Sequence, residues 1–135
     1  MYQQMIFVNL ATNDVAASRK FFTELGYPIN PQFSTDDCSC VVISDTIIAM
    51  LLSKQRYADF TKKEIADSTK TSEVLICLSA ESREKVDELV EKAVAAGGTA
   101  NDDVQDQGFM YGRSFEDLDG HSWEVAWMDP AAVQS

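Results

Sequence analysis

Few side chains in this chain can perform chemistry, and their scarcity limits what the protein can do. The sequence contains one histidine, His121, and three cysteines, Cys38, Cys40 and Cys77. A mononuclear iron site built from two histidines and one carboxylate cannot be assembled from a single histidine. His121 directly follows Asp-Gly, so we interpret it as part of a turn rather than as a catalytic base.

The cysteines lack the pattern of a zinc site or of a disulfide framework. Cys38 and Cys40 are two residues apart and share one face of a predicted strand, but no second pair accompanies them. An odd number of cysteines, without an export signal, argues against disulfide bonds. We therefore interpret the three thiols as small buried hydrophobic groups.

Several polar or polarisable side chains interrupt segments that otherwise look like buried strands. Glu124 alternates with Trp123 and Val125, so its carboxylate points to the opposite face of the strand. Such a carboxylate can bind a ligand or act as a general base, and it can equally form an ion pair with Arg113 on the preceding strand. The candidates for ligand contact are Asn9, Gln32, Met50, Tyr111 and Arg113.

The charge of the chain narrows the choice of partners. Acidic residues number 22 against 11 basic residues, for a formal net charge of −11. This charge repels nucleic acid and anionic membranes, and it either favours cationic ligands or serves solubility. No segment reaches the ~18 apolar residues of a membrane span, and the first residues lack a basic export region. We therefore expect a cytoplasmic protein.

The elements that carry these residues follow the same order in both halves of the chain. In the first half, the pattern predicts a helix over 15–25 that ends at Gly26. Strands are predicted around it, at 4–11, 30–33, 38–44 and 46–52. A polar segment, residues 54–71, then reads as a linker with one or two short helical turns.

The second half repeats this order. Ser82 is the predicted N-cap of a helix whose apolar side carries Val86, Leu89, Val90, Ala93 and Val94, and Gly97 and Gly98 end it. Strands are predicted at 73–79, weakly over 98–107, and at 109–115 and 121–128, with a turn at 117–120.

The repeated order defines the expected fold. We predict one α+β domain over residues 1–135, made of two β-α-β-β-β modules, about 1–53 and about 72–130, joined by the linker. Short hairpins would make each module a curled mixed sheet with its helix outside, leaving a ligand cleft between the two sheets.

Two stretches resemble the vicinal oxygen chelate superfamily, also called the glyoxalase/bleomycin-resistance/dioxygenase superfamily. Residues 8–26 contain Asp-Val-x-x-Ser-x-x-Phe-Phe before Leu-Gly, and residues 115–125 contain Asp-x-Asp-Gly-x-x-x-Glu. With this order of elements, the chain is similar to the group related to lactoylglutathione lyase. The resemblance covers nearly the whole chain and implies a homodimer.

The resemblance also implies a divalent metal, held in the cleft by four His, Glu or Gln side chains and acting as a Lewis acid. The first ligand position falls on Phe7, which cannot bind a metal, and no residue from Ile47 to Leu52 is a plausible ligand. The third position falls near Glu73 and the fourth on Glu124. We therefore expect no metal cofactor, with Glu73 and Glu124 as remnant ligands if a divalent metal does bind.

These observations leave two main hypotheses. The first is a metal-free protein that binds a small organic ligand in its cleft, similar to bleomycin-resistance proteins, which sequester a bulky cationic ligand. The alternative is a lyase or isomerase like lactoylglutathione lyase, with Glu124 as base or metal ligand. A structural subunit with an empty cleft is a third option, and an extradiol dioxygenase is disfavoured because it needs two histidines.

Overall fold

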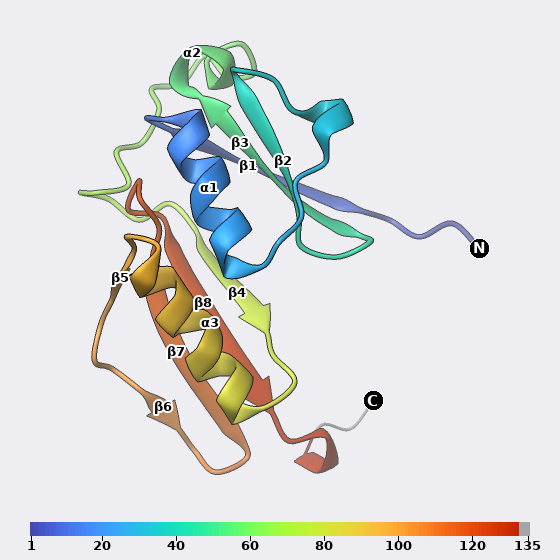
Figure 1. The fold of residues 1–135 in the computed structure, drawn as a ribbon, viewed down its shortest axis with the longest axis vertical. Helices are drawn as coiled ribbons and strands as arrows, with labels where there is room; N and C mark the ends of the chain where they lie inside the picture. The colour runs from blue at the N-terminus through green and yellow to red at the C-terminus, as the bar shows by residue number, and fades with distance from the viewer. Residues whose placement is uncertain (133–135) are drawn as a thin grey trace. The chain divides into compact units, whose positions relative to one another are not determined.

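The structure is a computed structural model that describes residues 1–132, and the chain divides into two compact units with a boundary between Asp67 and Ser68 (Figure 1). Each unit contains a mixed sheet and a long helix that packs on it. The predicted α+β class and its repeated modules are thereby confirmed. No helix among residues 1–132 is long and apolar enough to cross a membrane.

The first unit is built on a three-stranded sheet. Its strands lie in the order β1 (Ile6–Thr12), β3 (Ile47–Ser53) and β2 (Cys38–Val42). β1 runs parallel to β3, and β2 runs antiparallel to it. The predicted hairpin at Ser44 and Asp45 forms, and the Ile43 N–H donates to the Ile47 carbonyl at 3.0 Å.

Helix α1 (Val15–Leu25) begins and ends where the sequence predicts. The Asp14 side chain accepts a hydrogen bond from the Ala17 N–H at 3.0 Å, which satisfies one of the open donors of the first turn. Gly26 ends the helix with φ of 105°, a conformation that favours glycine. The buried side of the helix is Val15, Ser18, Phe21, Phe22 and Leu25.

The strand predicted at Asn30–Phe33 is wrong. This segment is a 3₁₀ turn, η1 (Pro31–Phe33), and only an isolated bridge joins Ile29 to Val41. Pro31 has no N–H to donate to a strand ladder, and the Asn30 side chain instead accepts from the Gln32 N–H at 2.9 Å. The first unit is therefore β-α-β-β, followed by the predicted helical turn, α2 (Lys54–Tyr57).

The second unit has a larger sheet. Its strands lie in the order β4 (Leu75–Ser79), β8 (Ser122–Met128), β7 (Met110–Glu116) and β5 (Thr99–Ala100), and β6 (Gln105–Asp106) also pairs with β7. β4 runs parallel to β8, and β7 runs antiparallel to it. The weak strand predicted over 98–107 is thus two short strands, because the polar residues between them form a loop. A 3₁₀ turn, η2 (Pro130–Ala132), follows β8.

Helix α3 (Arg83–Ala95) packs on β7 and β8 in this unit (Figure 1). The Ser82 side chain accepts from the Lys85 N–H at 3.1 Å, so the predicted N-cap is confirmed. Val86, Val90 and Ala93 are fully buried, whereas Val94, predicted on the same side, is 48% exposed. The buried side of this helix is thus narrower than the spacing of its apolar residues predicts.

Candidate functional site

The sheet of the second unit has one face covered by α3 and one face that its own helix leaves open. Arg113 reaches Asp87 on α3, and Phe115 stacks on the buried Trp123 at 6.3 Å, so both point toward the helix side. Ser114, between them, points the other way. Glu124 lies directly across from Ser114 on β8 and therefore shares this second face, which we call the open face of the second unit.

A pocket of about 330 Å³ lies on this open face. Strands β7 and β8 form its floor, and the loop between β5 and β6 contributes polar side chains. Its lining includes Cys77, Asn101, Asp103, Gln105, Met110, Arg113, Ser114, Glu124 and Ala126. The guanidinium of Arg113 is paired with Asp87. A concave site with a few convergent polar groups is the usual place for a small-molecule ligand.

The Glu124 carboxylate is exposed at this pocket and has no ion-pair partner within residues 1–132. The pairing with Arg113 predicted as an alternative is wrong, because Arg113 points to the helix side and its Nη1 lies 3.0 Å from Asp87 Oδ1. Cys77 lies across from Glu124 on β4. Burial raises the pKa of the Cys77 thiol, and the Glu124 charge raises it further.

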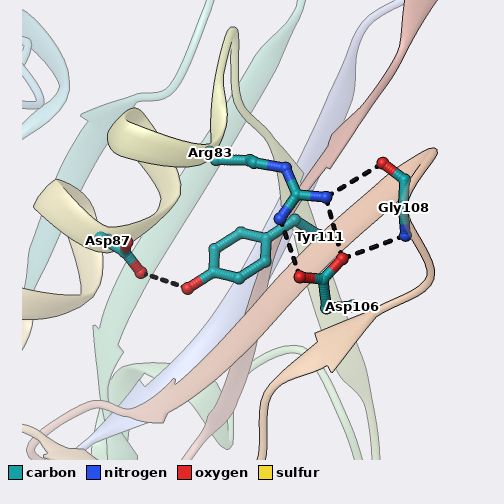
Figure 2. A network of polar contacts seen from close by, with 5 residues as sticks. All are labelled: Arg83, Asp87, Asp106, Gly108 and Tyr111. Carbon is teal, nitrogen blue, oxygen red and sulfur yellow. Dashed lines mark hydrogen bonds and ion pairs between the residues drawn. The ribbon is translucent and has the colours of Figure 1, made fainter.

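Tyr111 and Arg113, two of the predicted ligand-contact residues, both bind Asp87 on α3. The Tyr111 hydroxyl donates to Asp87 Oδ1 at 2.7 Å, as Figure 2 shows. This bond, together with Arg113, holds the pKa of Asp87 below its usual range, and it raises the pKa of Tyr111. Tyr111 does not line the Glu124 pocket, whereas Arg113 is one of its lining residues although its guanidinium is bound to Asp87. The contact of either residue with a ligand stays a prediction.

Arg83 extends this network toward the β6–β7 hairpin (Figure 2). Its guanidinium makes two 2.8 Å hydrogen bonds to the Asp106 carboxylate and a third, at 3.0 Å, to the Gly108 carbonyl. It also lies over the rings of Tyr111 and Trp127, with 5.1 and 5.4 Å to the centroids. Arg83 holds the pKa of Asp106 at about 2. These hydrogen bonds hold the β6–β7 hairpin against the first turn of α3. The spacing of the residues in the sequence does not predict them.

The candidates in the first unit lie on a different surface. Thr12 binds Ser18 of α1 at 2.6 Å, so the alternate residues of β1, including Asn9, point away from that helix. Met50 lies across from Asn9 on β3 and shares its face. Asn9 also lines a pocket of about 230 Å³, which it shares with Leu52, Tyr57, Phe60 and Thr61. Gln32 is exposed on η1 rather than carried by a strand.

The residues at the four positions where the superfamily carries its metal ligands do not fit a divalent metal. Phe7 lies across from Ile48, so this pair offers no donor atom to a metal. Glu73 precedes β4 and is exposed, and the residue that lies across from Glu124 is Cys77 rather than Glu73. The described residues at these positions therefore leave Glu124 without the partners of a four-ligand site.

Asp117, Asp119 and His121 form a group that the sequence interpretation did not treat as a metal site. Their possible ligand atoms lie within 4.8 Å of one another in the turn between β7 and β8. Asp117 accepts bonds from the backbone N–H groups of Asp119 and His121 and from Trp123 Nε1, at 3.0, 3.0 and 2.9 Å. Burial raises the pKa of Asp117, while His121 and these bonds lower it. Both Asp117 oxygens are thus engaged in holding the turn, and the motif Asp-x-Asp-Gly was its signal in the sequence.

His121 is held within the same turn. Its Nδ1 lies 2.9 Å from the Ser68 hydroxyl, and Gly120, with φ of 86°, passes so close to Ser68 that a Cβ there would lie 2.9 Å from the Ser68 carbonyl oxygen. A side chain at residue 120 would therefore displace the segment that precedes β4. This packing agrees with the interpretation of His121 as a turn residue.

The fold and the site define a class: a protein of two repeated α+β modules with a polar pocket on an open sheet face. Residues 4–44 match the family described as Bleomycin resistance protein-like N-terminal. A hypothetical protein from S. aureus shares the fold with a TM-score of 0.78 and 29% identity, over 94% of each chain. No curated protein matches the chain in sequence.

Solved structures of glyoxalase-related proteins also share the fold of this chain. A glyoxalase-related enzyme from Fulvimarina pelagi has a TM-score of 0.77 at 22% identity, over 93% of this chain and 88% of that one. A glyoxalase/bleomycin resistance protein/dioxygenase family enzyme from Burkholderia phytofirmans has a TM-score of 0.76 at 17% identity, over 93% and 99%. The family match over residues 4–44 and the shared fold agree with the resemblance to the vicinal oxygen chelate superfamily that the motifs predict.

Proposed function

We propose that this protein binds a small organic ligand, without a metal, in the pocket on the open face of the second unit. The observation that carries the proposal is the Glu124 carboxylate. It stands at the pocket without an ion-pair partner among residues 1–132, because Asp87 holds the nearby Arg113 on the other face of the sheet. A carboxylate in this position offers charge-assisted hydrogen bonds to a ligand.

The lining of the pocket favours a ligand with a cationic group and a small apolar body. Glu124 and Asp103 supply negative charge, whereas Met110 and Ala126 supply apolar surface. The net charge of −11 acts in the same direction, because it raises the local concentration of cations. The match of residues 4–44 to the bleomycin-resistance-like family supports binding as the function.

A matched pair of ligand panels tests this proposal. The EDTA-treated protein is titrated calorimetrically with small aromatic amines and with carboxylates of the same carbon skeletons. We expect the amines to bind at least about 10-fold more tightly, and Glu124→Gln to remove about 10-fold of that affinity, the size of one charge-assisted hydrogen bond. Equal binding of both panels, or full affinity in Glu124→Gln, would refute the proposal.

Glu116→Gln is the matched control for this experiment. Glu116 also projects from β7 onto the open face, but it lines a neighbouring hollow of about 140 Å³ and is not among the residues of the Glu124 pocket. Both variants remove one negative charge. A loss of amine affinity in Glu124→Gln but not in Glu116→Gln would therefore identify local contact rather than the overall charge of the protein.

The alternative is a glyoxalase-like lyase or isomerase in which Glu124 acts as base or metal ligand. Its support is the exposed carboxylate at a pocket that also holds the Ser114 hydroxyl and the Cys77 thiol. Metal that binds only the folded state raises the thermal midpoint, so titrations with Mn²⁺, Fe²⁺, Co²⁺, Ni²⁺ and Zn²⁺ test for a cofactor. A saturable rise that is lost in Glu124→Ala, with turnover of a thiol adduct, would favour the enzyme over the binding protein.

We also propose that the protein forms a homodimer. Two strands at the edges of their sheets, β1 and β4, carry exposed apolar side chains: Phe7 is 55% and Leu75 is 62% exposed. Exposed apolar side chains on unpaired edges favour association. Sedimentation velocity measures the mass directly, and a monomer at all accessible concentrations would overturn this expectation.

A further inference from the structure

Three sulfur-containing side chains gather on the sheet of the first unit, on the face turned away from α1. The Ser39 hydroxyl accepts from Arg19 Nε of α1 at 2.8 Å, so Ser39 points toward the helix. Its neighbours on β2, Cys38 and Cys40, therefore point to the opposite face. Met50 lies directly across from Cys40 on β3 and shares that face. Two thiols and one thioether thus occupy adjacent positions on two paired strands.

The two thiols are held in place and partly shielded from water. The side chain of Cys40 is 4% exposed, and Cys38 is half-buried. Cys38 Sγ lies 3.5 Å from the Phe33 carbonyl oxygen and 3.5 Å from Thr35 Oγ1, so the η1 segment fixes its position. Both are free thiols rather than members of a disulfide.

The spacing suits a metal better than a disulfide. Residues two apart on a strand are separated by about 6.6 Å, and their Cβ atoms by a similar distance. A disulfide needs Cβ atoms within about 4.5 Å, so it would strain the strand. Two metal–sulfur bonds span a longer gap than one S–S bond. Zinc prefers four ligands, whereas thiolate and thioether donors in small numbers select Cu(I).

We propose that Cys38, Cys40 and Met50 form a binding site for one soft monovalent cation of the Cu(I) type. The two thiols bind as thiolates and release their protons on binding, and Met50 supplies a third, weaker sulfur ligand. The site lies in the first unit, on different residues from the Glu124 pocket. Its test therefore does not require the proposed organic ligand.

An anaerobic titration of the full chain with Cu(I), in competition with a chromogenic Cu(I) chelator, tests this site. We expect one equivalent to bind, with the ultraviolet absorption of thiolate-to-copper charge transfer. Cys38→Ser and Cys40→Ser should each weaken binding at least about 100-fold, and Met50→Leu about 10-fold. Leucine is close to methionine in volume, so that variant keeps the packing.

Cys77→Ser is the matched control, because Cys77 is the third thiol of the chain and lies on the second unit. It should retain full Cu(I) affinity. Cys40→Ala, which places no hydroxyl in the buried position, provides a second variant if Cys40→Ser fails to fold. The proposal is overturned if the wild-type protein binds no Cu(I), if binding survives replacement of both Cys38 and Cys40, or if Cys77→Ser loses it equally.

Discussion

The two units share a backbone plan but differ in the chemistry of the faces that their own helices leave open. In each unit the first strand runs parallel to the last strand, which forms a hairpin with the strand before it. The first unit carries Phe7, Ile48, Met50 and Cys40 on that face, whereas the second carries Ser114, Glu116, Ser122 and Glu124.

This difference shows that two units with the same backbone plan present different side chains. The strand pairings are the same in both units, so each unit has equivalent positions on this face. Oxygen-bearing side chains occupy these positions mainly in the second unit. The helix sides also differ, because α1 buries a phenylalanine pair while α3 is fastened to its sheet by Arg83 and Asp87. The chemistry of each face thus depends on its individual side chains and not on the fold that the two units share.

The largest loss of stability is expected at the hairpin turns, because the turn aspartate is buried in the second unit and exposed in the first. Asp117→Ala should destabilise the protein by about 2–4 kcal/mol, because three donors in a buried turn lose their acceptor. Asp45 occupies the corresponding turn of the first unit and is exposed, so Asp45→Ala should change stability by less than about 0.5 kcal/mol. Urea unfolding of both variants measures the contrast, and equal losses would contradict it.

The helix N-caps should instead behave alike in the two units. Asp14→Ala and Ser82→Ala each remove a side-chain acceptor that binds a first-turn N–H at 3.0 or 3.1 Å. Each should cost about 1 kcal/mol of unfolding free energy. The same denaturation experiment checks this, with Ser72→Ala as an exposed control. A large difference between the caps would mean that the two helices contribute unequally to stability.

A smaller effect is expected on the reactivity of the Cys77 thiol, which lies across from Glu124. Glu124→Gln removes a charge that raises the pKa of Cys77, although burial, the larger cause, remains. In a background without the other two cysteines, the reaction of Cys77 with a thiol reagent near neutral pH should accelerate by about two- to fivefold, the size of one solvent-screened charge interaction. Glu116→Gln should leave the rate unchanged, and an unchanged rate in Glu124→Gln would place the two groups further apart.

The smallest effect on stability is expected at Asp106. Its pKa of about 2 lies below the ordinary value of 3.8 for an aspartate, so its pairing with Arg83 stabilises the folded state above pH 3.8. That contribution is lost as the pH falls from 3.8 through 2. Both side chains are substantially exposed, so the change should be slight. NMR titration of the carboxyl carbon measures the pKa, which should rise toward the ordinary value in Arg83→Gln.

Local sequence patterns predicted the elements well where one strong periodic or capping signal was present. The bounds of α1, the cap of α3 and the Asp117–Gly120 turn follow from such signals, because hydrogen bonds within a few residues decide them. The strand expected at Asn30–Phe33 failed because its apolar pattern was weak. Pro31 and the Asn30 side chain favoured a turn there.

The candidate site was only partly predictable. The alternation around Glu124 correctly separated its carboxylate from Trp123 and Val125, because side chains alternate strictly along a strand. The same rule placed Tyr111 and Arg113 on one face but did not say which. Their partner, Asp87, is more than twenty residues away on α3, and the packing of that helix decided the face.

By itself, then, the sequence determined most of the order of the elements and the position of Glu124 on its strand, both of which depend on contacts between near neighbours. The tertiary structure decided which side chains meet. Strand register placed Cys77 rather than Glu73 across from Glu124, and it set Met50 against Cys40. These pairings join residues at least ten positions apart, and no local periodicity encodes the register between such strands.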